Sequence, residues 1–380
     1  IIEKTARPGQ KLLMSGNGMC NITHGGSIKD FVDRYGSQKR FVRSCLYRHN
    51  NLELMSVMES LGVPLTERAD GKIFPSSLKA RDILDALLAK AGQGGWETRY
   101  SAEVTSLRIV QADGSRAAAP PQIEVSLSDG TALETSKLII ATGGASYPAT
   151  GSDGSFFEVL RHDLGLCIAK PRPALTPVYV QDYRYAGLSG ISFQDMEITC
   201  GGHTARGPML ITHKGFSGPA VLHISQYVRF GMQLHINHFP SSSIQQVYQK
   251  IRSDQPGNKT GIANYISSEF RLPKAFAVKM LAAPQRRLCD IGHKELENIT
   301  RLLMDRIYSV SGTGGWNDAM VTAGGVSTDR INPGNMSLKK TNEDPSDADI
   351  RIIGEVLDIN GDTGGYNLQF AYSSAMAALD

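Results

Sequence analysis

Hydrophobic residues recur with helical spacing in some segments of the chain and with strand spacing in others. From Asp30 to Leu61 apolar positions fall three or four residues apart, which predicts a series of helices. Residues 80–91, ARDILDALLAKA, repeat that spacing and predict a second amphipathic helical region. Three strand-like runs follow at 103–110, 122–127 and 137–142, with turn residues at Gly114 and at Asp129-Gly130. These runs predict an antiparallel meander.

Two further apolar runs predict buried strands. Residues 137–144, KLIIATGG, are almost continuously apolar, so a central strand covered on both faces is expected. Ile1-Ile2 before Glu3 indicates the end of another buried strand. Residues 351–379 predict a strand, a loop and a closing helix.

The pattern of hydrophobic and polar residues changes in the middle of the chain. PRPALTPV, residues 171–178, holds three prolines and predicts a crossing between domains. Mixed strand signals follow to residue 240, and residues 241–306 are largely helical and polar. We therefore predict one α/β nucleotide-binding domain from residues 1–172 and 316–380. A second domain, residues 173–315, is inserted into it, β-rich over 173–240 and helical over 241–306.

Composition narrows the function classes. The 380 residues are 41% hydrophobic, with 39 glycines and a formal net charge of +3. This charge permits contact with a polyanion without indicating a dedicated nucleic-acid binder. Five cysteines without a C-x-x-C pair argue against a disulfide framework and against a structural zinc, and a reducing cytoplasm is the default location. The chain shows no apolar run long enough to span a membrane.

Glycine clusters mark the candidate ligand site. Gly16-Asn17-Gly18 begins like a G-x-G-x-x-G dinucleotide fingerprint, but Asn21 stands in place of the third glycine. Glu3 matches the strand-end acid that accepts hydrogen bonds from a ribose about 20 residues after such a fingerprint, which would place the fingerprint before Ile1. An ordinary strand-end glutamate is the alternative.

Two later segments carry stronger signals. Thr142-Gly143-Gly144 ends an apolar strand, where a flat ligand or its phosphate arm can approach the backbone, although any tight turn uses such glycines. Glu355 follows a strand and can accept from polyol hydroxyls. Thr363-Gly364-Gly365 opens the last helix, whose N-terminal N–H groups suit a phosphate or an electron-rich carbonyl. A plain threonine N-cap is the alternative.

Together these segments resemble the FAD-dependent flavoproteins that include aminoacetone oxidase, the BaiN bile-acid reductases and the RdsA (YhiN)-like ribosomal-RNA reductases. The resemblance rests on residues 1–4, 11–23, 141–148, 212–220, 321–326 and 354–369, the last close to G-E-x-L-D-x-x-G-x-T-G-G-Y-N. It implies a glutathione-reductase-like FAD-binding domain of Rossmann type with an inserted β-barrel plus helical domain. It also implies bound FAD, with NAD(P)H binding transiently.

The implied cofactor-binding residues come from all of these segments. They are Glu3, Lys4, Lys11, Ser15, Gly16, Gly18, Cys20, Asn21, Thr142, Gly143, Gly144, Gly354, Glu355, Asp358, Thr363, Gly364, Gly365, Tyr366 and Asn367. The chain departs from the family in two respects. The initial strand, G-x-G-x-x-G and helix are absent from this sequence, and Met19 replaces a basic residue of the family pattern.

Catalytic residues are hard to identify, because hydride transfer at a flavin needs little beyond orientation and a proton source. The weak candidates are Cys20, His24, His213 and Tyr147. Cys20 also suits a buried filler, and loop histidines are commonly plain hydrogen-bonding residues. No metal site is expected.

We predict an FAD-dependent oxidoreductase with hydride transfer at flavin N5, on a uridine C5–C6 bond in ribosomal RNA. The basic runs at 34–48 and at 274–287 are compatible with RNA, and equally with solvated helix faces. The alternatives are a small-molecule amine oxidase or enone reductase, and a non-catalytic flavin-fold remnant or RNA-binding module. No membrane association and no stable protein partner are expected.

Overall fold

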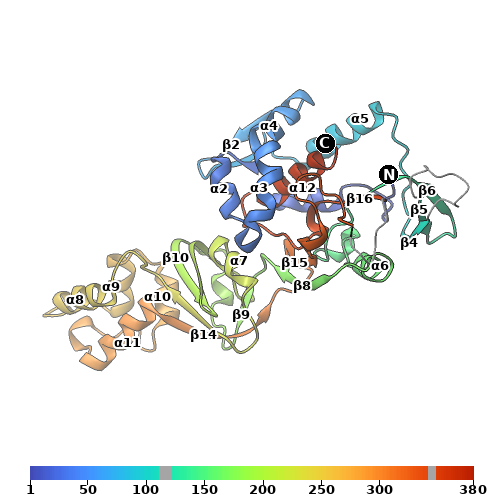
Figure 1. Ribbon diagram of the computed structural model, residues 1–380. Helices are drawn as coiled ribbons and strands as arrows, with labels where there is room; N and C mark the ends of the chain where they lie inside the picture. The colour runs from blue at the N-terminus through green and yellow to red at the C-terminus, as the bar shows by residue number, and fades with distance from the viewer. Residues whose placement is uncertain (111–121, 341–347) are drawn as a thin grey trace, which may run out of the picture. The chain divides into compact units, whose positions relative to one another are not determined.

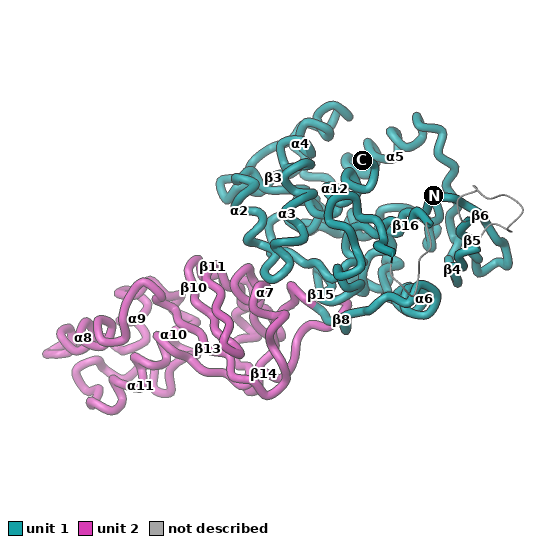
Figure 2. The backbone as a smooth tube through the Cα atoms, viewed as in Figure 1, with its two compact units in different colours: residues 1–173, 319–380 teal, residues 174–318 magenta. Residues whose placement is uncertain are grey.

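The computed structural model describes residues 1–110, 122–340 and 348–380. Its two compact units consist of residues 1–173 with 319–380, and of residues 174–318 (Figure 2). Unit 1 therefore joins the two ends of the chain, and unit 2 is one continuous segment between them.

Unit 1 contains helices of moderate length (Figure 1). Among these, α2 and α4 have side-chain caps at the residue before their first helical residue. In α4 the Asn50 Oδ1 accepts the Glu53 N–H at 3.1 Å, which satisfies one of the unpaired donors at a helix start. The helices are α1 (Gln10–Met14), α2 (Ile28–Asp33), α3 (Lys39–Arg48), α4 (Asn51–Ser60), α5 (Ala80–Gln93), α6 (Phe156–Asp163) and α12 (Tyr366–Ala377). Short 3₁₀ helices include η1 (Ser15–Gly18) and η7 (Gly354–Val356).

The strands of unit 1 form several small sheets. They are β1 (Thr23–His24), β2 (Leu65–Glu67), β3 (Lys72–Pro75), β4 (Val104–Val110), β5 (Gln122–Leu127), β6 (Ala132–Thr135), β7 (Lys137–Ile140), β8 (Ile168–Ala174), β15 (Val321–Val326) and β16 (Asp349–Ile352). The sheets have the orders β1-β3-β2, β4-β5-β6, β15-β8 and β16-β7. β16 and β7 run parallel, with Asp349 opposite Lys137 and Ile352 opposite Ile140.

The structure corrects two of the strand predictions. The third strand of the antiparallel meander is β6, and the run that begins at Lys137 instead pairs in parallel with β16 from the C-terminal region. β7 is also not covered on both faces, because Ile139 is 39% exposed and lines a cavity. An apolar run reports that a strand is hydrophobic, but it does not identify the neighbour that covers it.

The structure also corrects the prediction that Ile1-Ile2 ends a buried strand. Ile1 is 60% exposed, and Ile2 forms only an isolated parallel bridge with Arg99 rather than the end of a buried strand. The Glu3 N–H nevertheless donates to the Arg99 carbonyl at 2.8 Å, which fixes the backbone beside the acidic side chain. Gly114 lies outside the described residues, so its predicted turn is not tested.

Unit 2 is a closed six-stranded barrel with an attached helical group. The barrel order is β10-β11-β12-β9-β14-β13, and the pairs between neighbours are antiparallel. Its strands are β9 (Val178–Val180), β10 (Ser192–Cys200), β11 (His203–Ile211), β12 (Phe216–Ser217), β13 (Gln233–Asn237) and β14 (Arg306–Thr313). The helices are α7 (Pro219–Ser225), α8 (Ile244–Asp254), α9 (Ile262–Glu269), α10 (Lys274–Met280) and α11 (His293–Met304).

The barrel and the helices of unit 2 share one hydrophobic core. It includes Ile198 and Phe216 from strands and Phe276 and Leu303 from helices. This arrangement confirms the barrel-plus-helices fold that the family resemblance implies. Unit 1 has two separate cores, one around α3, β5, β16 and α12 and the other around α4, β3 and α5. No helix in the described ranges is both long and apolar enough to cross a membrane.

Candidate functional site

A cavity of about 1170 Å³ lies within unit 1. Its walls come from the first twelve residues, the loop around Arg99, strand β7 with the loop after it, and residues 150–157. The cavity is large enough for a dinucleotide, since small-molecule sites commonly span about 300–1,000 Å³. Six of the residues predicted from the sequence line it, namely Glu3, Lys4, Lys11, Thr142, Gly143 and Gly144.

Glu3 presents a carboxylate to this cavity. Its Oε1 accepts the backbone N–H and the hydroxyl of Thr5, each at 2.8 Å, and these bonds fix the side chain. Among the described residues no hydrogen bond to Oε2 is formed, so this oxygen can accept from a ligand hydroxyl. Lys4 instead contacts Glu103 at 2.7 Å and Asp153 at 2.8 Å. Burial lowers the pKa of Lys4, but the hydrogen bonds to Asp153 and Glu103 outweigh it and leave the pKa raised.

Lys11 joins the cavity to the C-terminal motif. Its Nζ lies 2.5 Å from Glu355 Oε2 and 3.1 Å from Ser152 Oγ. The other oxygen of Glu355 accepts the Thr322 N–H at 2.8 Å. Gly144 packs against the same group, because a Cβ there would lie 2.2 Å from Thr322 Oγ1. The structure thus brings Lys11, Gly144 and Glu355 together from three distant segments.

Gly354 and Asp358 anchor the segment that carries Glu355. The Gly354 N–H donates to Ser374 Oγ at 3.0 Å, and Asp358 Oδ1 accepts the Gly324 N–H at 3.0 Å. Burial raises the pKa of the Asp358 carboxyl, and the Gly324 bond opposes that rise. These contacts hold η7 against β15 and α12. Within the described residues they make Gly354 and Asp358 part of the scaffold of the site.

A second group of predicted residues surrounds the loop after α1. Gly16, Asn17 and Gly18 all have left-handed backbone conformations, with φ of 55°, 59° and 82°. Ser15 ends the helix, its hydroxyl donating to the Leu12 carbonyl at 2.6 Å. Cys20 is 0% exposed, and burial raises the pKa of its thiol to about 11. The thiol is therefore protonated at neutral pH.

Asn21 connects this loop to the start of α12. With its amide oriented to satisfy the surrounding groups, the oxygen accepts the Gly365 N–H at 3.0 Å, and the nitrogen donates to the carbonyls of Thr23 and Ile73. Gly365 has φ of 94°, and a Cβ there would lie 2.6 Å from the Thr23 backbone. Close approach of β1 to the helix start therefore requires glycine. Asn367 closes the preceding turn through bonds to Gly361.

His24 and Tyr366 form an aromatic wall beside Gly364. Their rings stack with centroids 5.6 Å apart, and both line a cavity of about 280 Å³ with Phe31 and Arg34. The His24 Nδ1 accepts the Gly26 N–H at 3.1 Å, so Nε2 carries the proton and donates to the Asp70 carbonyl at 3.0 Å. Both ring nitrogens are thus engaged by the backbone, which opposes a role for His24 in proton transfer.

Three candidates remain to be placed, Tyr147, Thr363 and His213. Tyr147 follows the glycine loop in unit 1, with φ of 55°, and Thr363 precedes the two glycines before α12. His213 belongs to unit 2, where its side chain is exposed in the turn between β11 and β12. No three His, Cys, Asp or Glu side chains gather as metal ligands in the parts of the chain that the structure describes.

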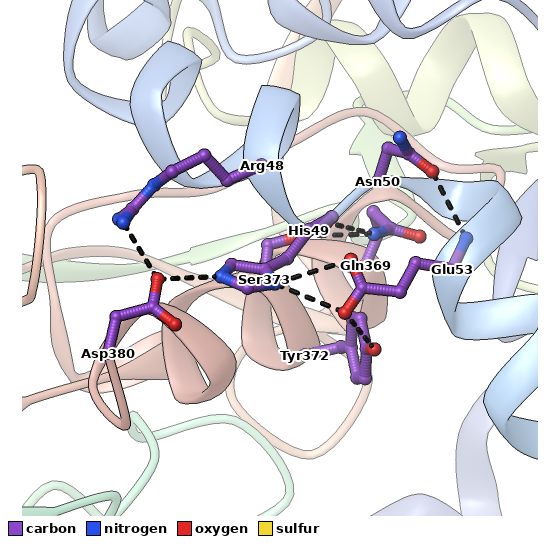
Figure 3. Close-up of polar contacts among 8 residues, drawn as sticks. All are labelled: Arg48, His49, Asn50, Glu53, Gln369, Tyr372, Ser373 and Asp380. Atoms are coloured by element: carbon purple, nitrogen blue, oxygen red, sulfur yellow. Dashed lines mark hydrogen bonds and ion pairs between the residues drawn. The ribbon is translucent and has the colours of Figure 1, made fainter.

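A polar network that sequence reasoning missed fixes α12 against the junction of α3 and α4 (Figure 3). The His49 ring lies 3.1 Å from Glu53 and 3.0 Å from Asp380, and Tyr372 donates to Glu53 at 3.0 Å. Buried Gln369 accepts the Thr23 hydroxyl at 2.6 Å and donates to the His49 carbonyl. Polar residues at four-residue spacing in α12, Gln369 and Ser373, are the only sequence signal for this contact.

Comparison with known proteins identifies the family. The family described as HI0933-like protein Rossmann domain matches residues 1–380, the whole chain. The chain belongs to the HI0933-like family of flavoprotein oxidoreductases. Its mixed α/β fold of Rossmann type and its six-stranded barrel agree with the predicted fold class.

Relatives of this HI0933-like chain carry different activities in their names. The "Ribosomal RNA dihydrouridine synthase" of Haemophilus influenzae is 28% identical over 99% of this chain and 90% of its own length. The enzyme of the same name from Escherichia coli is also 28% identical, with the same coverage. The "3-dehydro-bile acid delta(4,6)-reductase" of Clostridium scindens is 25% identical over 100% of this chain and 91% of its own length.

Solved structures with a similar chain path are more distant. A 3-ketosteroid-Δ4-(5α)-dehydrogenase from Rhodococcus jostii RHA1 has a TM-score of 0.43 and 12% identity, over 100% of this chain and 91% of its own. A flavocytochrome c3 fumarate reductase has a TM-score of 0.41 and 14% identity, over 100% and 74%.

The residues of this HI0933-like chain fit a dinucleotide cofactor such as FAD. The large cavity has the necessary volume and is lined by Glu3 and Lys11, and Glu3 Oε2 forms no hydrogen bond among the described residues. Such an oxygen suits a ribose hydroxyl and such a cation suits a phosphate. Beyond α1 the chain continues directly into the left-handed loop at Gly16–Gly18.

Proposed function

We propose that this chain is an FAD-dependent oxidoreductase that reduces a uridine C5–C6 bond in ribosomal RNA, with NAD(P)H as the electron donor. The observation that carries the substrate assignment is the match to two ribosomal RNA dihydrouridine synthases along 99% of the chain. The cavity with Glu3 and Lys11 supports the cofactor assignment.

In this proposal the large cavity would hold the cofactor. Glu3, Lys4 and Lys11 would hold its ribose and phosphates, and Thr142, Gly143 and Gly144 would lie beside it. Glu355 is held by Lys11 and by the backbone N–H of Thr322, and the Thr322 side chain packs against Gly144. The flavin supplies hydride at N5 when bound. The reaction adds this hydride and one proton across a carbon–carbon double bond conjugated to a carbonyl.

The sequence assigns no catalytic residue, and the weak candidates for the proton source are Cys20, His24, His213 and Tyr147. The buried Cys20 thiol holds its proton at neutral pH, whereas His24 has both ring nitrogens occupied by backbone groups. These two observations favour Cys20 over His24.

A small-molecule enone reductase is the second candidate. The bile-acid reductase of Clostridium scindens matches over the full chain, and its name describes reduction of a steroid double bond. A steroid enone and a uracil ring share one reactive feature, a double bond conjugated to a carbonyl. The two candidates therefore require the same transfer at the flavin and differ in the surface that receives the substrate.

Two measurements test these proposals. The purified protein is expected to absorb near 370 and 450 nm, as flavins do. A colourless protein that takes up no added FAD would contradict the enzyme proposal and favour a non-catalytic remnant. Ribosomal RNA from a deletion strain is then examined by mass spectrometry. Loss of one dihydrouridine, restored by the wild-type gene, supports the RNA assignment, whereas an unchanged RNA together with NAD(P)H-dependent enone reduction supports the second candidate.

A further inference from the structure

Unit 2 carries the excess positive charge of the chain. Residues 174–318 hold 15 lysines and arginines against 10 aspartates and glutamates, a formal net charge of +5. Residues 1–173 with 319–380 hold 25 against 27, a net charge of −2. A polyanion is attracted by the local distribution of charge rather than by its average. Unit 2 is therefore the part of the chain suited to a polyanion.

Ion pairs neutralise some of the cations that the sequence groups together. In the basic run at 274–287, Arg286 lies 2.6 Å from Glu295 and Arg287 lies 2.7 Å from Asp290. An exposed cation in such a pair must give up its carboxylate before it can neutralise a phosphate. These two arginines therefore do not provide free positive charge.

Lys279 of the same run is exposed and contacts a loop that carries a second exposed cation, Arg184. The Lys279 Nζ donates to the Arg184 carbonyl at 3.3 Å, so α10 and the loop of residues 182–188 lie side by side. The buried Tyr185 ring of this loop packs on the Phe276 ring of α10, with centroids 5.2 Å apart. A buried aromatic contact thus fixes the two charged segments together.

Tyr183 joins the turn between β11 and β12 to the same loop. Its hydroxyl lies 2.6 Å from the Thr212 carbonyl oxygen and 2.9 Å from that of Gly215. Lys214, between these two residues, is exposed. Three neighbouring segments thus carry one exposed cation each, and we call these three residues the basic surface: Arg184, Lys214 and Lys279.

The basic surface has little opposing negative charge. Asp182 is the single acid in residues 182–188, 212–215 and 274–280. In the described part of the chain the ion pairs of unit 2 use other cations, such as Arg206 and Lys250. Free ammonium and guanidinium groups bind phosphate oxygens, and each such contact releases counterions condensed on a nucleic acid.

We propose that the basic surface binds the phosphate backbone of single-stranded RNA. This inference rests on the proposed RNA substrate and adds the part of the chain that holds it. Repeating phosphates match several fixed cations, whereas a neutral steroid enone has no phosphate to bind. The RNA is single-stranded because an enzyme that acts on a base needs it outside the helical stack. Contacts of this kind hold and orient the RNA without reading its sequence.

The experiment measures binding of a fluorescent single-stranded oligoribonucleotide by anisotropy over a range of salt concentrations. Each phosphate contact on a single strand contributes about 0.7 to the slope of log affinity against log salt concentration. The triple variant Arg184→Gln, Lys214→Gln and Lys279→Gln is expected to lower the magnitude of this slope by about 2. Arg184→Lys is expected to keep the wild-type slope, because the charge remains.

A second triple variant, Lys250→Gln, Arg286→Gln and Arg287→Gln, is the matched control. It removes the same charge from unit 2, but each of its cations is already paired with an acid. Its slope is expected to stay close to that of the wild type. Thermal unfolding shows whether each variant is folded. If the first triple variant is not, the three single variants are measured, each with an expected decrease of about 0.7.

Equal slopes in the two triple variants overturn the basic surface and leave the proposed function intact. Unchanged RNA binding with weakened NAD(P)H affinity also overturns it, because the cations then serve the phosphates of the electron donor. A wild-type protein that binds no RNA refutes both the surface and the RNA substrate. Ribosomal RNA that keeps its dihydrouridine in a deletion strain contradicts the proposed function alone, if RNA binding still depends on the basic surface.

Discussion

The ammonium of Lys11 lies 2.5 Å from the carboxylate of Glu355, although the two residues are 344 positions apart. Lys11 is on α1 and Glu355 is in η7, so this single contact joins the first and last segments of unit 1. It also places an acid beside Lys11, which lines the large cavity. The two halves of the interrupted domain therefore meet at the candidate cofactor site.

Lys11→Met is expected to weaken both folding and cofactor binding. The substitution leaves the partly buried Glu355 carboxylate without its cation, at a cost of about 1–2 kcal/mol in the free energy of unfolding. Chemical denaturation measures this loss, and FAD titration measures the affinity. Arg108→Met is the control, because the Arg108–Glu124 pair is more exposed and neither residue lines the large cavity. An equal effect of the two variants on FAD affinity would contradict a role for Lys11 there.

Gly365→Ala is expected to be strongly destabilising. The new Cβ would lie 2.6 Å from the Thr23 backbone, and φ is 94°. Gly190→Ala separates the two causes, since Gly190 has φ of 95° and no atom of the described residues lies within 4 Å of a new Cβ. We expect a loss of about 1 kcal/mol at Gly190 from backbone strain alone. At Gly365 the loss should exceed this by about 2 kcal/mol or more, because β1 and α12 must separate. Equal losses in urea titrations would refute the close approach.

Reactivity of the cysteines should follow their burial. The thiol of Cys20 is buried and has its pKa raised to about 11, and that of Cys45 has its pKa raised to about 12. The thiolate is the reactive form, so neither should react with a thiol reagent at pH 7.5. Cys167 is exposed and should be labelled first. Peptide mapping after brief labelling checks the order, and rapid labelling of Cys20 in the folded protein would contradict it.

The stability of unit 2 should fall in mild acid because of His238. Burial lowers the pKa of this ring to about 4, and Arg306 lowers it further, while a hydrogen bond to the Leu303 carbonyl opposes the shift. The unfolded chain binds a proton below pH 6.5, and the folded ring does not until about pH 4. The contribution is therefore complete above pH 6.5 and is lost as the pH falls to 4, by about 3 kcal/mol.

His238→Phe tests this prediction. Phenylalanine keeps an aromatic ring among Phe193 and Phe276 and cannot be protonated. Unfolding measured between pH 4 and 7 should then lose this part of its pH dependence. The variant also leaves the Leu303 carbonyl without the ring nitrogen, which lowers stability at every pH by a constant amount. A pH profile parallel to that of the wild type would show that His238 is not the group responsible.

The sequence by itself determined several of the local elements and the family. Helical spacing predicted α5 and the closing α12, and the change at PRPALTPV lies next to the boundary of the units at residues 173 and 174. The residues around Thr363-Gly364-Gly365 indicated the family, which the match over the whole chain confirmed. These features depend on residues close together in the chain, so a periodic pattern or a short motif reports them.

Only the tertiary structure decided which distant residues meet. It paired β7 with β16, joined Lys11 to Glu355, and brought Lys279 to Arg184. It also replaced the expected buried strand at Ile1-Ile2 by a single bridge. An apolar or charged residue shows what kind of neighbour it needs, but many segments can supply one. Packing of the whole unit selects among them, because each pairing must be compatible with all the others at once.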